Sequence, residues 1–231
     1  MGFRYGALFD MDGVLIDNAE YHILAFEEWC REKGIAFDRE LFTTKLFGKQ
    51  NGDIFLALTG VEMSPEDVVS EGDYKEAIYR RIYADNVKLL DGIPGFLADL
   101  KAEGFGLAVA TSGPPENAAL VLEMGGITSV FDAIVTCRDT SRGKPDPEVF
   151  ILAANRLGLS TDKCVVFEDS KAGAKAAQAS GAALIGVTTG HRDLDHASMM
   201  IGDFREISAA DVIELLADKC PDIQPTQERN T

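Results

Sequence analysis

Short, nearly continuous apolar runs recur along the chain and predict buried parallel strands. Apolar and polar residues do not alternate within them, which is typical of a sheet covered by helices on both faces. The runs are YGALF (5–9), GLAVAT (106–111), DAIVT (132–136), CVVFE (164–168) and AALIGV (182–187). Stretches that close at a glycine lie between the runs and predict helices over 95–104, 115–126, 146–158 and 170–181. This alternation predicts an α/β fold with a doubly wound parallel sheet.

One long segment interrupts the alternation, because it has helical patterning and no convincing strand. Near its start, Ile23, Phe26 and Trp29 recur at the spacing of one helix face. Two further stretches in it, 52–60 and 71–85, have the same helical character. The sequence therefore predicts an all-helical insert between the first strand and the rest of the sheet.

This pattern predicts two domains. The core is expected to consist of residues 1–17 and 87–231, and the helical insert of residues 18–86. Asp17 stands where the chain leaves the core, and we interpret it as a structural hinge residue. Residues 220–231 are polar and contain prolines, so we expect them to form a frayed tail.

Charge and length limit the possible partners. With 231 residues, the chain can bury a full core. Its formal net charge of −16 argues against nucleic acid and against an anionic membrane surface, since both attract basic proteins. An anionic substrate would have to be held by local donors or by a metal ion. No apolar stretch approaches the roughly 20 residues of a membrane helix and no signal-peptide pattern is present, so we expect a cytoplasmic monomer.

The cysteines are widely spaced and form no Cys-x-x-Cys pair. They are Cys30, Cys137, Cys164 and Cys220. This spacing favours small hydrophobic side chains in a reducing cytosol over a disulfide framework or a zinc site.

Two acidic residues follow the first predicted strand, where Asp10 and Asp12 stand two positions apart. If the strand geometry continues, both carboxylates point to the same side. Gly13 allows the chain to turn away from the strand. Carboxylates at this spacing suit one nucleophile and one acid/base group, with a Mg²⁺ ion reducing their mutual repulsion. The alternative is an ordinary solvated turn.

The second strand also ends in polar groups, at Thr111, Ser112 and Gly113. Thr111 offers a hydroxyl, and the next two residues offer backbone N–H groups near the start of a helix, which suits a phosphate. The same residue types would also serve as a plain helix N-cap. Because ligands of such sheets bind at the carboxyl ends of the strands, we expect these groups to lie near Asp10.

A lysine and two acids complete the set of polar residues near strand ends. Lys144 precedes a helix and could neutralise an oxyanion, or it could simply be solvated. Glu168 and Asp169 follow four apolar residues and could complete an oxygen shell for Mg²⁺, which prefers hard ligands. The alternative is that these acids only cap the next helix.

The order of these features resembles the four motifs of the haloacid dehalogenase superfamily. They are Asp-x-Asp-Gly-Val, then Thr, then Lys-Pro, then Glu-Asp. The resemblance covers nearly the whole chain, and it implies a Rossmann-like core with a helical cap inserted after the first motif. FDMDGVLIDNAEYH (9–22) and GKPDPEVF (143–150) are most similar to the β-phosphoglucomutase-like group of phosphatases and mutases.

The resemblance implies a role for each motif residue. Asp10 would attack phosphorus and form an aspartyl-phosphate, while Asp12 would act first as acid and then as base. Mg²⁺ would be held by the Asp10 carboxylate, the Asp12 backbone carbonyl and Asp169, with Glu168 bound directly or through water. The presence of Asp12 argues for phosphoryl transfer over dehalogenation. Thr111 and Lys144 would stabilise the charge on the phosphoryl oxygens, and the backbone N–H groups of Ser112 and Gly113 are the further phosphate contacts expected from the strand end.

The helical insert is expected to separate a phosphatase from a mutase, because a mutase must hold a second phosphate there. Its candidate substrate or phosphate contacts are His22, Lys49, Asn51 and Lys75. Asn51 stands where the resemblance implies arginine in a mutase, and Phe47 stands where it implies a basic residue. The lysines could equally lie on an exposed helix face, and His22 could be a packing residue.

These departures favour a Mg²⁺-dependent phosphatase that acts on a small phosphorylated metabolite, such as a sugar phosphate. A mutase of the β-phosphoglucomutase type is the first alternative. A catalytically silent binding domain is the second, although every motif position is filled.

Overall fold

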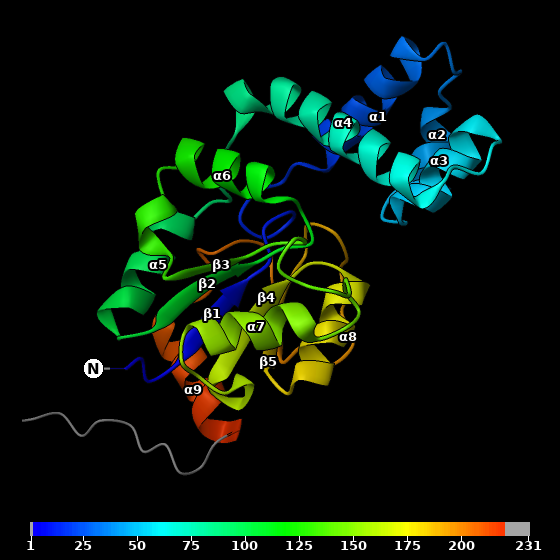
Figure 1. Ribbon diagram of the computed structural model, residues 1–231. Helices are drawn as coiled ribbons and strands as arrows, with labels where there is room; N and C mark the ends of the chain where they lie inside the picture. Colours follow the sequence, from blue (N-terminus) through cyan, green and yellow to red (C-terminus); the bar gives the residue numbers. More distant parts are fainter. Residues whose placement is uncertain (1, 220–231) are drawn as a thin grey trace, which may run out of the picture. The chain divides into compact units, whose positions relative to one another are not determined.

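The computed structural model describes residues 2–219, and within them a parallel sheet of six strands has the order β3-β2-β1-β4-β5-β6 (Figure 1). Its strands are β1 (Gly6–Phe9), β2 (Gly106–Ala110), β3 (Ala133–Val135), β4 (Cys164–Glu168), β5 (Ala183–Val187) and β6 (Met199–Ile201). The first strand of the chain lies inside the sheet, because β1 pairs with β2 on one side and with β4 on the other. The predicted parallel α/β fold is confirmed, and the predicted tail lies outside the described residues.

The described chain divides into two compact units. One contains the residues up to Asp17 and those from Lys88 onward, and the other is Asn18–Val87. The helices of the first unit are α5 (Ile93–Ala102), α6 (Pro115–Met124), α7 (Glu148–Arg156), α8 (Lys171–Ser180) and α9 (Ala209–Lys219), with single turns η3 (Thr128–Val130) and η4 (Thr161–Lys163). We refer to this unit as the core unit and to Asn18–Val87 as the helical unit.

Every element of the helical unit is a helix. They are α1 (Ala19–Glu32), α2 (Arg39–Leu41), η1 (Phe42–Leu46), α3 (Asn51–Thr59), α4 (Pro65–Tyr83) and η2 (Ala84–Asn86). Helix α4 begins earlier than the sequence pattern predicted. The hydroxyl of Ser64 accepts the N–H of Asp67 at 3.1 Å, and Pro65 occupies the first turn, so the start is set by capping rather than by apolar periodicity.

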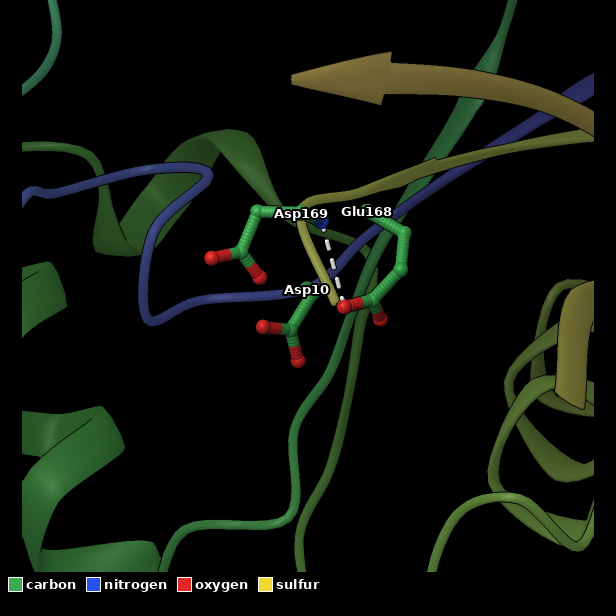
Figure 2. A group of neighbouring side chains, drawn as sticks. All are labelled: Asp10, Glu168 and Asp169. Carbon is green, nitrogen blue, oxygen red and sulfur yellow. Dashed lines mark hydrogen bonds between the residues drawn. The ribbon is translucent and has the colours of Figure 1, made fainter. Parts of the chain in front are cut away.

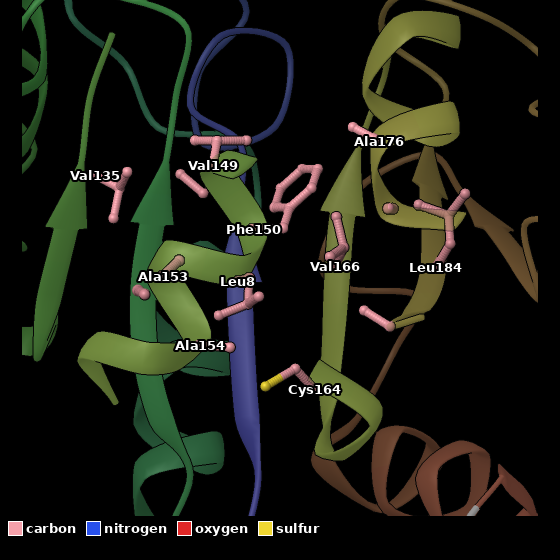
Figure 3. Close-up of a cluster of buried hydrophobic side chains, with 14 of the residues drawn as sticks. Leu8, Val135, Val149, Phe150, Ala153, Ala154, Cys164, Val166, Ala176 and Leu184 are labelled. Atoms are coloured by element: carbon pink, nitrogen blue, oxygen red, sulfur yellow. The ribbon is translucent and has the colours of Figure 1, made fainter. Parts of the chain in front are cut away.

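Both faces of the sheet are buried, which explains the unbroken apolar runs. On one face, Leu8 and Val166 belong to a cluster with Phe150 of α7 and small residues of α8 (Figure 3). On the other face, Phe9 and Phe167 stack at 4.6 Å between ring centroids and pack against aromatic residues that include Phe96 of α5. Full burial of one such side chain contributes about 1.5–3 kcal/mol, so this core holds the strand ends in a fixed register.

The end of the sheet was not predicted. β6 is a short edge strand in which Met199 is exposed, so its residues do not form a continuous buried run. Cys30 and Cys164 are buried, as expected for small hydrophobic side chains, whereas Cys137 is exposed, and Cys220 lies outside the described residues. No helix within the described residues combines the length and apolar character needed to cross a bilayer.

Candidate active site

Asp10 lies at the carboxyl end of β1, beside the end of β4. Its backbone N–H donates to the carbonyl of Phe167 at 3.0 Å, which extends the β1–β4 ladder by one residue. Because Phe9 pairs with Phe167, the residues that follow the two strands emerge side by side. Asp10, Glu168 and Asp169 therefore converge, and each offers an oxygen within 4.8 Å of the others (Figure 2).

Lys144 is the cation of this cluster. Its Nζ donates to Asp10 Oδ1 at 2.6 Å and to Glu168 Oε2 at 2.7 Å, and its side chain is only 7% exposed. The alternative of a solvated loop lysine is therefore wrong. The loop before it is held by Glu148 of α7, whose Oε2 accepts hydrogen bonds from the backbone and hydroxyl of Ser141 and from the N–H of Arg142.

Glu168 is completely buried, and both of its carboxylate oxygens are used. Oε1 accepts from the N–H of Asp169 and from the N–H and hydroxyl of Ser170, while Oε2 accepts from Lys144. Ser170 also caps α8, since its hydroxyl accepts the N–H of Gly173 at 3.0 Å. The alternative that the two acids only cap this helix is wrong, because Ser170 does so.

Gly173 is a site residue that the sequence analysis missed. A Cβ built on it would lie 2.0 Å from both Cδ and Oε2 of Glu168, so only glycine leaves room for this carboxylate over the first turn of α8. A glycine inside a predicted helix was the available signal, since such a residue costs stability unless another group approaches it closely.

The three acids fit a divalent cation bound through oxygen. Their carboxylates are buried or half-buried, and within the cluster the charge of Lys144 is smaller than the combined charge of three ionised acids. Hard carboxylate oxygens are the ligands that Mg²⁺ takes in proteins. The backbone carbonyl of Asp12 is the remaining ligand expected from the sequence.

The protonation of the cluster reflects this excess of acid. Burial raises the pKa of Asp10 from 3.8 to about 8, against the opposing attraction of Lys144. Burial, with added repulsion from Asp10 and Glu168, raises the pKa of Asp169 to about 9. Burial alone would lower the pKa of Lys144, but the carboxylates of Asp10 and Glu168 outweigh it and raise that pKa above 10.5. A dication would favour the ionised acids.

Thr111 extends β2 in the same way that Asp10 extends β1. Its N–H donates to the carbonyl of Val135 at 3.0 Å, and its buried hydroxyl accepts the N–H of Gly113 at 2.9 Å. The N-cap of α6 is Pro114, so the alternative that Thr111 or Ser112 caps this helix is wrong.

The predicted phosphate cradle has fewer backbone donors than the sequence analysis assumed. Pro114 and Pro115 have no N–H, and the Gly113 N–H is used by Thr111. Asp12 faces this segment, since a Cβ built on Gly113 would lie 3.7 Å from Asp12 Oδ2. The hydroxyl of Thr111 and the carboxylate of Asp12 therefore adjoin the same short loop.

The remaining predicted residues belong to the helical unit, and the structure brings two of them together. Lys75 is buried, with its Nζ 3.4 Å from His22 Nδ1, and it forms an ion pair with Glu76. His22 stacks on Tyr79 with 4.1 Å between ring centroids. The exposed-face alternative is thus wrong for Lys75, and the packing role suggested for His22 is present.

Lys49 and Asn51 differ in their surroundings. Lys49 is exposed. Asn51 opens α3 and lies against α4, where a Cβ built on Gly72 would be 2.7 Å from the Asn51 amide nitrogen. Asp17 is exposed at the end of the core segment and is not part of the acidic cluster.

The chain is similar to known proteins along most of its length. A family model described as haloacid dehalogenase-like hydrolase matches residues 7–187. The chain is 33% identical over 193 residues to β-phosphoglucomutase of Bacillus subtilis (strain 168), covering 79% of this chain and 83% of that protein. It is 31% identical to validoxylamine A 7′-phosphate phosphatase of Streptomyces hygroscopicus subsp. limoneus, covering 87% and 94%. A crystal structure of a HAD hydrolase, family IA, variant 3, from Entamoeba histolytica HM-1:IMSS is similar with a TM-score of 0.83, at 28% identity, covering 92% and 99%.

Proposed function

The chain belongs to the haloacid dehalogenase-like hydrolase family, and we propose that it is a Mg²⁺-dependent phosphatase acting on a small phosphorylated metabolite, specifically a sugar phosphate. One observation carries this proposal: Asp10, Glu168 and Asp169 converge at the ends of β1 and β4, with Lys144 between two of them. By their names, one of the two relatives described above is a mutase of phosphoglucose and the other a phosphatase of validoxylamine A 7′-phosphate, which supports a small phosphorylated compound as the substrate.

In this proposal, Asp10 is the nucleophile. Its carboxylate oxygen attacks phosphorus, the ester P–O bond breaks, and Asp12 gives a proton to the leaving alcohol oxygen. Asp12 then takes a proton from water as the water attacks the aspartyl-phosphate, which releases inorganic phosphate and restores the Asp10 carboxylate. Lys144 donates to Asp10 and opposes its protonation, and together with the Thr111 hydroxyl it stabilises charge on the phosphoryl oxygens.

The residues that would hold Mg²⁺ are the carboxylates of Asp10 and Asp169 and the backbone carbonyl of Asp12. When bound, the ion would reduce the repulsion among the acids and the charge on the phosphoryl group. Glu168 accepts four hydrogen bonds from protein donors, which favours a position behind the ligands, contacting the ion through water. The direct role of Glu168 is then to position Lys144 through their hydrogen bond.

The test is a panel of phosphorylated sugars and polyols with released phosphate as the readout, at saturating Mg²⁺ and with EDTA. We expect Mg²⁺-dependent release from at least one compound and none from the Asp10→Asn variant. Release that persists in Asp10→Asn would contradict the assigned nucleophile. Wild-type protein that turns over no compound in the panel would favour the silent binding domain.

A mutase of the β-phosphoglucomutase type is the second candidate, because the Bacillus subtilis relative has that name. The helical unit argues against it. Lys75, the buried cation there, is already paired with Glu76, and Asn51 supplies an amide in place of the expected arginine. Incubation with β-glucose 1-phosphate and catalytic glucose 1,6-bisphosphate separates the two. Glucose 6-phosphate formed without free phosphate would establish the mutase.

A further inference from the structure

The loop that follows β5 reaches the acidic cluster from a third strand. The N–H of Thr188 donates to the carbonyl of Ile201 in β6 at 2.9 Å, and the hydroxyl of Thr189 donates to the carbonyl of Gly13. The next residue is Gly190, which lies against Asp169. The loop over 188–190 therefore connects the β5–β6 edge of the sheet to the turn that follows Asp12.

Gly190 approaches the carboxylate of Asp169 more closely than any other residue type could. A Cβ built on Gly190 would lie 2.3 Å from Asp169 Oδ2, 2.8 Å from its backbone oxygen and 3.0 Å from its Cγ. The ordinary separation of non-bonded heavy atoms is about 3.5–4.0 Å. Substitution of Gly190 by alanine must therefore displace the Asp169 side chain. The loop over 188–190 cannot simply move to relieve the contact, because the backbone oxygen of Asp169 also lies close to the new methyl group.

A second glycine lies against the same oxygen. A Cβ built on Gly13 would lie 2.1 Å from Asp169 Oδ2, so that oxygen lies against both Gly13 and Gly190. Gly13 has a φ of 78°, which by itself requires glycine. Gly190 has no positive φ, so its backbone conformation is open to alanine and only the contact with Asp169 requires glycine.

We propose that Gly190 is a positioning residue that fixes the carboxylate of Asp169 for Mg²⁺ binding. The backbone atoms of Gly13 and Gly190 lie against Oδ2 of this carboxylate and limit its movement before an ion binds. The ion then finds its ligands already oriented, which lowers the cost of binding. This inference rests on the proposed function, since it assigns a purpose to the Mg²⁺ site.

The experiment compares Gly190→Ala with Gly95→Ala. Gly95 lies in α5, where a Cβ would meet nothing within 4 Å, so it is a matched control outside the site. Calorimetric titration of metal-free protein with MgCl₂ measures the metal affinity directly. We expect Gly190→Ala to weaken Mg²⁺ binding by about 10–100-fold, as for other residues that orient metal ligands, and Gly95→Ala to leave it unchanged.

Kinetics provide a second readout. In Gly190→Ala, the Mg²⁺ concentration for half-maximal activity should rise with the dissociation constant, while KM for the phosphate ester at saturating Mg²⁺ stays near the wild-type value. A folded Gly190→Ala variant with wild-type Mg²⁺ affinity would overturn the inference.

A double variant keeps the test decisive if Gly190→Ala does not fold. Removing the carboxylate with Asp169→Ala should recover part of the stability that Gly190→Ala loses, as measured by urea unfolding in EDTA, because the contact with the backbone oxygen of Asp169 remains. If Gly190→Ala lowers stability equally in the wild-type protein and in Asp169→Ala, the contact with the Asp169 carboxylate is refuted. Wild-type protein that does not bind Mg²⁺ would instead refute the proposed function, and the coupling between Asp169 and Gly190 would still report on the positioning contact.

Discussion

Replacing Lys144 with methionine should destabilise the protein in a pH-dependent way. The change keeps most of the side-chain volume but removes the charge that contacts Asp10 at 2.6 Å and Glu168 at 2.7 Å. The pKa of Lys144 is raised above 10.5, so the lysine is charged throughout pH 5–9 and its contribution is fully present there. The pH dependence of the variant must therefore come from the carboxyl groups.

The magnitude follows from one additional buried carboxyl group. Without Lys144, one more carboxyl of the cluster retains its proton in the folded protein, whereas it ionises in the unfolded chain above about pH 4. Stability relative to wild type then falls by about 1.4 kcal/mol per pH unit, or about 2.7 kcal/mol between pH 5 and pH 7. At pH 7, the total loss in the free energy of unfolding of Lys144→Met should approach the roughly 3–5 kcal/mol that is lost when a buried ion pair loses one partner.

The assay is urea unfolding in EDTA at pH 5, 6, 7 and 8. Lys101→Met is the matched control, because Lys101 pairs with Asp132 at 2.5 Å at a partly exposed site. This variant should lose less than about 1 kcal/mol of stability, and the loss should not grow with pH as it does in Lys144→Met. A loss of stability in Lys144→Met that is below 1 kcal/mol at pH 7, or equal at pH 5 and pH 8, would refute the reasoning.

Three further predictions concern the same cluster. Asp10→Asn should lower kcat by about 10⁴-fold or more while near-ultraviolet circular dichroism stays native, and a smaller loss would remove Asp10 from the nucleophile's role. Gly173→Ala should destabilise the protein by about 1–3 kcal/mol in urea unfolding, through the contact with Glu168, whereas Gly95→Ala in α5 should not. Because burial raises the pKa values of Asp10 and Asp169 to about 8 and 9, stability of the metal-free protein should fall as pH rises from about 4 toward 9. The increase in Tm on adding MgCl₂ should therefore grow from pH 5.5 to pH 8.5, and an increment independent of pH would contradict those shifts.

The sequence was most informative at the strand ends. Parallel strands place their carboxyl ends at one edge of the sheet, so residues as distant as Asp10 and Asp169 could be assigned to one site from local patterns alone. Lys144 was expected to neutralise an anion, but its two acidic partners were not predicted, because a loop has no periodicity that fixes its path. A cytoplasmic monomer remains a prediction.

Contacts made through glycine were the hardest to foresee. Gly190 was passed over because it stands in an unpatterned loop, and its importance depends on a neighbour 21 positions earlier in the chain. Lys75 was assigned equally to an exposed face or to a ligand, and it is in fact buried beside His22, since a long helix can hold a lysine inside when a partner such as Glu76 is adjacent.

The interior position of β1 in the sheet has a consequence during protein synthesis. Its partners β2 and β4 begin only at Gly106 and Cys164, so at about 5–20 residues per second the ribosome completes them roughly 5–20 s and 8–30 s after β1. For that interval an apolar segment ending in the acids of the site has no strand to pair with. The nascent chain is therefore exposed to misassociation early, and Asp10 reaches its native surroundings only after Glu168 and Asp169 have been synthesised.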